Sequence, residues 1–407
     1  MMTKLKKILP HKKMVDRMLK SSPAKAEVDQ LFREKSTILD EIPVARKEAE
    51  SPQVRMNGDW LSVGYQTGQL TNGMFRNVQF NKSPTPRSLP KVFQANLRNV
   101  ADKAFEFDGH ALGMTLIDRG RIVYQRFNHT DANTEFMGWS MSKSLTNILI
   151  GQALCAGDIT SLNSAASQFV PDIKGTAYGD STIKELLTMS SGAFAPDPLT
   201  GEHPGDFYDW THGFKSQRNL IHLYGASRGE RGKFAYDNLN SDVLGLVLDS
   251  RKDRRIYMQN LLNQAGVEKE SHWMADKEDV LHASYGFGAT LDDWAKIAQL
   301  SLDMLRGAAD IPNKEGMRQF MSDGVAQIIS PSEIGSPSRY GWGYTWTNPK
   351  YKQGYAWLGA YGQAVWVHPD TQRVLIVFRH LKNSSFYENM ELCMFEPWVL
   401  GKFDRPN

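Results

Sequence analysis

The segment WSMSKSLTNILIGQAL, from Trp139 to Leu154, constrains this 407-residue chain more than any other. Its apolar residues cover most of a helical circumference, so we expect a buried helix. Yet Lys143 stands in the first turn, three residues after Ser140. Burying an ammonium group costs on the order of several kcal/mol unless it is paired or gives up its proton. A lysine at this place therefore needs a chemical reason.

The Ser140–Lys143 spacing puts the two side chains one helical turn apart. A desolvated lysine with a lowered pKa can accept the proton of a neighbouring serine hydroxyl and so activate it as a nucleophile. The positive end of the helix dipole would also stabilise an oxyanion formed there. The pair therefore indicates nucleophilic catalysis on Ser140.

A serine and a lysine at this spacing are weak evidence alone. The other pairs precede segments with a polar face, where serine is expected to cap a helix and lysine to be solvated. These pairs are Ser22/Lys25, Ser88/Lys91 and Ser181/Lys184. The segment after Ser140 differs from them because it is apolar all round.

Two later segments supply residues that would complete a site. Tyr236-Asp237-Asn238 opens the apolar segment KFAYDNLNSDVLGLVL. The stretch YAWLGAYGQAVWVHP carries Gly359 and Gly362, where a strand backbone can come close to another group. In this order the three segments resemble the serine hydrolases related to class C β-lactamases and D-Ala-D-Ala peptidases. They are most similar to the esterase and 6-aminohexanoate-dimer hydrolase branch, over roughly residues 90–400.

This resemblance implies roles for individual residues. Ser140 would be the nucleophile, and Lys143 and Tyr236 would share the proton transfers as a coupled pair, with the identity of the base left open. Asn238 would hydrogen-bond near Lys143 and the substrate. The family needs no metal ion and no organic cofactor.

The third motif of the family, Lys-Thr-Gly, is matched here by Trp357-Leu358-Gly359. The backbone amide of the next residue, Ala360, would form the oxyanion hole together with that of Ser140. The family lysine helps to bind the carboxylate of penicillins and peptides, and tryptophan cannot do this. The change favours an uncharged ester or linear amide as the small-molecule substrate, with Trp357, Gly359 and Tyr361 as binding residues. The two aromatic rings could instead pack on the sheet.

The secondary-structure pattern fits the implied α/β (α+β) class. Two β-rich runs around Asp118–Arg121 predict a hairpin over 110–127, and 364–381 predicts two strands around a Pro-Asp turn. Residues from about 160 to 320 are mostly helical in pattern. We therefore expect a central antiparallel sheet built from both chain ends, flanked by helices, with an inserted, mainly helical region.

We expect this domain to occupy residues 86–407, preceded by a basic arm and an irregular wrap over 1–85. The first twenty residues hold seven Lys or Arg and one acid, a net charge of +6, so the other 387 residues sum to −3. The apolar core of a secretory signal is missing, which favours the cytoplasm. The arm is interpreted as a solvated tail, with weak contact to a membrane surface as the alternative. An overall charge of +3 is too small to indicate nucleic-acid binding, and the oligomeric state stays open.

Several alternatives remain at this point. An α/β-hydrolase would need G-x-S-x-G, and the nearest match, 138–142, lacks the second glycine. A β-lactamase or DD-peptidase is disfavoured by the missing Lys-Thr-Gly, and a catalytically silent binding protein could share the fold. The long loop 193–214 is either a lid over the cleft or a plain surface excursion. Its candidate substrate contacts are Asp206, Tyr208, Asp209 and Trp210.

Overall fold

The computed structural model of this chain describes residues 76–193, 216–226, 228–276, 278–326, 341–347, 354–379 and 394–403. Most of the expected N-terminal arm and the loop with Asp206, Tyr208, Asp209 and Trp210 lie outside these ranges. None of the helices in these ranges has both the length and the apolar character that a membrane-spanning helix needs.

The larger of two sheets has seven strands in the order β3-β2-β11-β10-β9-β8-β7, and every neighbouring pair is antiparallel. Strand β2 comes from the first half of the chain and pairs with β11 near its end, which confirms the predicted sheet. The antiparallel order also excludes the α/β-hydrolase alternative, whose sheet is mostly parallel. The strands are β2 (Ala111–Asp118), β3 (Arg121–Phe127), β7 (Gly341–Trp342), β8 (Trp346–Thr347), β9 (Tyr355–Gly359), β10 (Gln363–His368) and β11 (Arg373–Arg379).

The predicted hairpins are present. Arg119 and Gly120 connect β2 to β3, and both have positive φ, 49° and 76°. Two-residue hairpin turns of type I′ require this conformation because its twist matches that of the strands. The Pro369-Asp370 turn joins β10 to β11 as expected.

A second sheet was not predicted. It has the order β1-β5-β6-β4, with β1 (Arg76–Phe80), β4 (Glu135–Met137), β5 (Ser271–Ala275) and β6 (Phe287–Thr290). Strands β5 and β6 interrupt the region expected to be helical. Strand β1 precedes the domain boundary that was expected after residue 85. Strands of three to five residues are too short for a two-residue period to be recognised.

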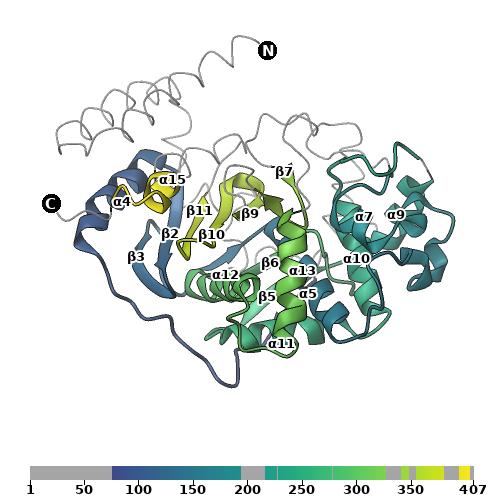
Figure 1. The fold of residues 1–407 in the computed structure, drawn as a ribbon, viewed down its shortest axis with the longest axis horizontal. Helices are drawn as coiled ribbons and strands as arrows, with labels where there is room; N and C mark the ends of the chain where they lie inside the picture. Colours follow the sequence, from purple (N-terminus) through teal and green to yellow (C-terminus); the bar gives the residue numbers. More distant parts are fainter. Residues whose placement is uncertain are drawn as a thin grey trace, which may run out of the picture.

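Helices cover both faces of the larger sheet (Figure 1). On one face, α4 and α15 share an apolar cluster with Trp366 and Trp398. On the other face, α5, α12 and α13 join the larger cluster that includes Trp294 and Trp357. The helices named so far are α4 (Ala95–Asp108), α5 (Met141–Cys155), α12 (Leu291–Arg306), α13 (Lys314–Ala326) and α15 (Glu396–Val399).

The remaining helices belong to the inserted region. Figure 1 shows α7, α9 and α10 grouped on the far side of α5 from the larger sheet. Helix α5 therefore lies between the sheet and the insertion, at the centre of the molecule. The insertion contains η3 (Ala166–Gln168), η4 (Pro171–Ile173), α6 (Ala177–Asp180), α7 (Ile183–Leu187), α9 (Gln217–Gly225), α10 (Asn238–Asp249) and α11 (Arg254–Ala265), and a further short turn, η5 (Ala360–Gly362), follows β9.

Candidate active site

Ser140 is the N-cap of α5, and Lys143 lies in the first turn of the same helix. The Lys143 side chain is buried, with 1% of its surface exposed. Its Nζ donates to Ser140 Oγ at 2.9 Å and to the backbone carbonyl of Ser284 at 2.8 Å. The structure therefore brings the amine and the hydroxyl into direct contact, in surroundings that exclude water.

A sharp turn presents Ser140. Trp139 just before it has a φ of 50°, a left-handed conformation that costs a bulky residue roughly 1–2 kcal/mol. The turn is held to β6, because Gly138 N–H donates to the carbonyl of Phe287 at 2.8 Å. Ser142 Oγ donates to the carbonyl of Trp139 at 2.8 Å and accepts from Phe287 N–H at 3.1 Å. These bonds keep the strained turn in place.

The three serines of this segment differ in exposure. Ser140 is partly exposed, whereas Ser142 and Ser144 are 0% and 4% exposed. Ser144 Oγ also hydrogen-bonds Thr345 Oγ1 at 2.9 Å. An incoming carbonyl can thus reach the hydroxyl of Ser140 and not those of its two neighbours.

Tyr236 lies beside Lys143. Lys143 Nζ is 5.1 Å from the centre of its half-buried ring. The next residue, Asp237, is the N-cap of α10 and accepts from Leu239 N–H at 2.9 Å and from Tyr178 O–H at 2.6 Å. Burial raises the pKa of the Asp237 carboxyl to about 6. Asp237 therefore fixes the chain that carries Tyr236.

Asn238 was predicted to hydrogen-bond near Lys143 and the substrate, and this stays a prediction. Asn238 begins α10 and is partly exposed, and the hydrogen bonds of Lys143 within the described chain go to Ser140 and Ser284. Sequence reasoning missed Ser284. Its contribution is a backbone carbonyl, which any residue type could supply, so its side chain gave no signal.

Strand β9 ends against the turn before Ser140. A Cβ atom built on Gly359 would lie 2.2 Å from the carbonyl oxygen of Gly138, far closer than atoms can approach. After it, Tyr361 has a φ of 62°, and its ring centre is 5.0 Å from that of Trp139. This arrangement places the end of β9 against the turn that precedes Ser140. The oxyanion amide of Ala360 stays a prediction.

The position of Trp357 differs from the expected one. Its ring is 1% exposed and packs 6.5 Å from the rings of Trp294 and Tyr355, measured between ring centres. A side chain buried in this way does not contact a substrate directly. Trp357 instead fills apolar core, which is the packing role left open for it in the sequence.

We predict that Gly359→Ala lowers turnover of an ester substrate by about 10²- to 10³-fold, the usual effect of losing one oxyanion donor. The new methyl group would push β9 away from Gly138, whose backbone oxygen cannot move aside alone. Steady-state kinetics check this, with Gly229→Ala as control, because a Cβ there meets only an ordinary contact at 3.5 Å. Unchanged turnover in Gly359→Ala would refute the predicted oxyanion hole.

Comparison with known proteins agrees with this geometry. The family model described as Beta-lactamase matches residues 100–390, well over half of the chain. The chain belongs to the beta-lactamase family. A curated relative of this beta-lactamase-family protein is the 6-aminohexanoate-dimer hydrolase of Paenarthrobacter ureafaciens, 23% identical over 260 residues. That match spans 58% of this chain and 64% of the relative, less than two thirds of its length.

Solved structures show the same fold. A 6-aminohexanoate-dimer hydrolase homologue from Bacillus anthracis has a TM-score of 0.67 at 16% identity, covering 82% of this chain and 93% of its own. EstCE1, a hydrolase with promiscuous acyltransferase activity, has a TM-score of 0.58 at 13% identity, covering 74% and 97%. A class C beta-lactamase has a TM-score of 0.53 at 14% identity, covering 74% and 95%. The expected fold is confirmed.

Proposed function

We propose that this protein is a serine hydrolase that cleaves a carboxylic ester or a linear amide through an acyl-enzyme on Ser140. Ser140 Oγ attacks the carbonyl carbon while its proton passes to Lys143 or Tyr236. The backbone amides of Ser140 and Ala360 hold the oxyanion. The proton then moves to the leaving group, and water releases the acyl group by the reverse route.

One observation carries the proposal. Lys143 Nζ is buried and lies 2.9 Å from a serine hydroxyl that is itself partly exposed. A structural lysine in a core is normally paired with a carboxylate, as Lys296 is with Asp293 at 2.7 Å. Lys143 instead contacts an alcohol and a carbonyl, which suits proton transfer better than packing.

The substrate class follows from the third motif. The position of the family's lysine holds the buried Trp357, so the cation that would bind a substrate carboxylate there is replaced by an apolar ring. This favours neutral substrates, in line with the 6-aminohexanoate-dimer hydrolase and the hydrolase EstCE1 among the similar proteins. The class C beta-lactamases of the same fold keep β-lactam hydrolysis as the alternative.

A substrate screen tests this choice. We expect turnover of short-chain 4-nitrophenyl esters or of a linear amide, and little or none of a chromogenic cephalosporin. A preference for the cephalosporin would support the beta-lactamase alternative. Folded protein that turns over none of the three and does not react with a fluorophosphonate probe would be a silent binding protein.

We predict that Tyr236→Phe lowers ester turnover by about 10²- to 10⁴-fold, the range expected for a lost acid–base group. The ring over Lys143 is retained, so the change removes only the hydroxyl. The loss should be greater for an ethyl ester than for a 4-nitrophenyl ester, because the poorer leaving group needs the proton more. Tyr257→Phe is the control, since Tyr257 bonds Asp158 at 2.6 Å outside the site. Equal losses for both esters would argue against proton delivery by Tyr236.

A further inference from the structure

A buried polar network lies behind Lys143, on the side away from Ser140. Ser284, whose carbonyl accepts from Lys143 Nζ, is itself bonded twice by one carboxylate. Asp242 on α10 accepts from Ser284 N–H at 3.1 Å and from Ser284 Oγ at 2.9 Å. Both residues are 0% exposed. A continuous path thus runs from Ser140 through Lys143 and Ser284 to Asp242.

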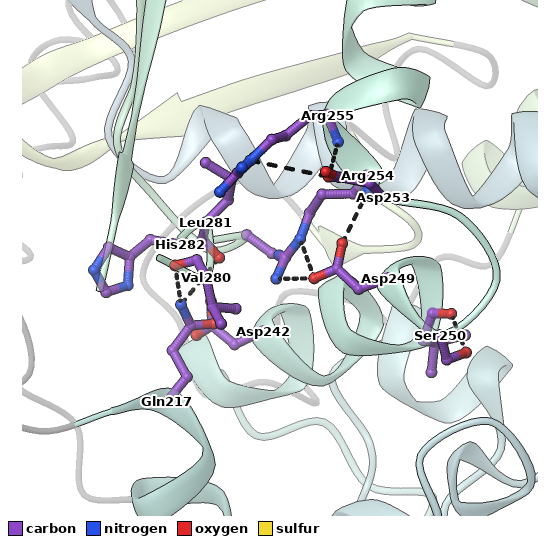
Figure 2. A network of polar contacts seen from close by, with 12 residues as sticks. Gln217, Asp242, Asp249, Ser250, Asp253, Arg254, Arg255, Val280, Leu281 and His282 are labelled. Atoms are coloured by element: carbon purple, nitrogen blue, oxygen red, sulfur yellow. Dashed lines mark hydrogen bonds and ion pairs between the residues drawn. The ribbon is translucent and has the colours of Figure 1, made fainter. Parts of the chain in front are cut away.

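The same region contains a second buried cation. Figure 2 shows Arg254 reaching from α11 to Asp249 at the end of α10, with Asp242 and His282 nearby. Arg254 is 1% exposed, and its Nε donates to Asp249 Oδ2 at 2.9 Å. Arg254 is therefore paired directly with Asp249. Within the described residues, both hydrogen bonds that Asp242 accepts come from Ser284.

The charge of Asp242 matters to Lys143. The hydrogen-bond partners of Lys143 in the described ranges are a neutral hydroxyl and a neutral carbonyl. Asp242 and Asp237 both interact electrostatically with Lys143, and both are buried. In water-excluding surroundings such a charge acts with little screening. The Asp242 carboxylate, which Ser284 separates from the Lys143 ammonium group, thereby balances its charge without a direct ion pair.

We propose that Asp242 is a positioning residue for the reaction, which holds the Ser284 carbonyl against Lys143 Nζ and supplies the counter-charge behind the Ser140–Lys143 pair. The inference rests on the proposed function. It goes beyond it because Asp242 touches neither the nucleophile nor the substrate. It acts through Ser284. Its loss should therefore keep Ser140 in place and weaken the activation of its hydroxyl by Lys143.

Titration of Asp242 gives a readout that a purely structural residue would lack. Burial raises the pKa of this carboxyl to about 7, against the lowering effect of Ser284, Lys143 and Arg254. Among the described residues, Tyr178 from α6 also interacts with Asp242, and burial raises its pKa well above the usual value. His282 lies in the same region (Figure 2). Burial lowers the pKa of His282 to about 3, so that ring stays neutral.

We therefore expect the turnover number of the wild-type protein to rise with pH through about 7, as Asp242 becomes ionised. The effect on stability has the opposite sign. A carboxyl with a raised pKa in the folded state holds its proton more tightly there than in the unfolded chain, so the free energy of unfolding falls as pH rises from about 4 to about 7. Asp242→Asn should remove this fall, and its Tm relative to the wild type should be higher at pH 8 than at pH 5.

The experiment compares pH profiles of 4-nitrophenyl ester turnover for wild type, Asp242→Asn and Ser284→Ala. We expect Asp242→Asn to lose at least about tenfold in the turnover number above pH 7 and to lose the rise near pH 7. Ser284→Ala keeps the backbone carbonyl and loses one of the two hydrogen bonds to Asp242. Its turnover number should therefore fall less, and the rise in turnover should move to a different pH. Should Asp242→Asn not fold, the displaced profile of Ser284→Ala decides.

The matched control is Asp293→Asn. Asp293 is a buried carboxylate, 1% exposed, that bonds Lys296 Nζ at 2.7 Å and Glu268 N–H at 2.8 Å. Its loss should lower Tm and leave the shape of the pH profile unchanged. A wild-type profile in Asp242→Asn, or the same change in Asp293→Asn, overturns the inference. If wild-type protein neither turns over the ester nor reacts with a fluorophosphonate, the proposed function itself has failed.

Discussion

Ser140→Ala is expected to abolish ester hydrolysis, with a loss of roughly 10⁴- to 10⁶-fold in the turnover number. Any remaining rate would come from binding and from the oxyanion hole, which the substitution leaves in place. The fold should be unaffected, because Ser140 caps α5 without a side-chain hydrogen bond to the helix backbone. Turnover kinetics and labelling with a fluorophosphonate probe measure the effect.

The neighbouring serines provide the controls for this labelling. Ser144→Ala should still be labelled at the wild-type level, since Ser144 is buried and bonded to Thr345. Ser142→Ala should also be labelled, although it loses the bond between the Trp139 turn and Phe287 and should melt at a lower temperature. Labelling that survives in Ser140→Ala, or disappears in Ser144→Ala alone, would place the nucleophile elsewhere.

Lys143→Met is expected to separate activity from stability. Methionine nearly matches the volume of the lysine side chain and removes the amine, so ester turnover should fall by about 10²- to 10⁴-fold. The Tm should fall less than in a lysine that is paired directly, because Asp242 and Asp237 interact with Lys143 without a direct ion pair and can take up a proton when the cation is lost. Kinetics and thermal unfolding of the same preparations measure both effects.

A second buried lysine provides the control for Lys143→Met. Lys296 is 3% exposed and is paired directly with Asp293 at 2.7 Å and with Glu268 at 2.9 Å. Lys296→Met leaves the buried Asp293 without its cation and should destabilise the fold by about 3–5 kcal/mol, with the turnover of the remaining folded protein unchanged. If Lys143→Met behaved like Lys296→Met, losing stability and keeping turnover, Lys143 would be a structural residue.

Local sequence rules predicted those parts of the fold that short-range physics controls. The Asp118–Arg121 turn formed because Arg119 and Gly120 can adopt positive φ. Helix α5 ended where Gly157 follows Ala156, with a φ of 79° at the glycine. The helix cap expected at Ser181 lies one residue later. Thr182, not Ser181, caps α7, in a reciprocal arrangement with Glu185.

Long-range contacts account for what the sequence did not reveal. Strands β4 and β6 contain three and four residues and pair across more than 140 positions, so no local pattern marks them. Trp357 could have faced a cleft or the core, because alternation in a strand gives two faces but not their neighbours. Packing against Trp294 settles it.

In the candidate site, too, some features follow from the sequence alone and others only from the tertiary structure. The sequence alone determined that Ser140 and Lys143 share a helical turn inside an apolar helix, because helical spacing and amphipathicity are properties of neighbouring residues. It also supplied the order of Tyr236 and the Gly359 strand, on which the family resemblance rests. The tertiary structure decided that Ser284 and Asp242 stand behind Lys143. Their bonds join residues 42 and 141 positions apart, and only the packing of α5 against α10 and the segment before β6 brings such groups within hydrogen-bonding distance.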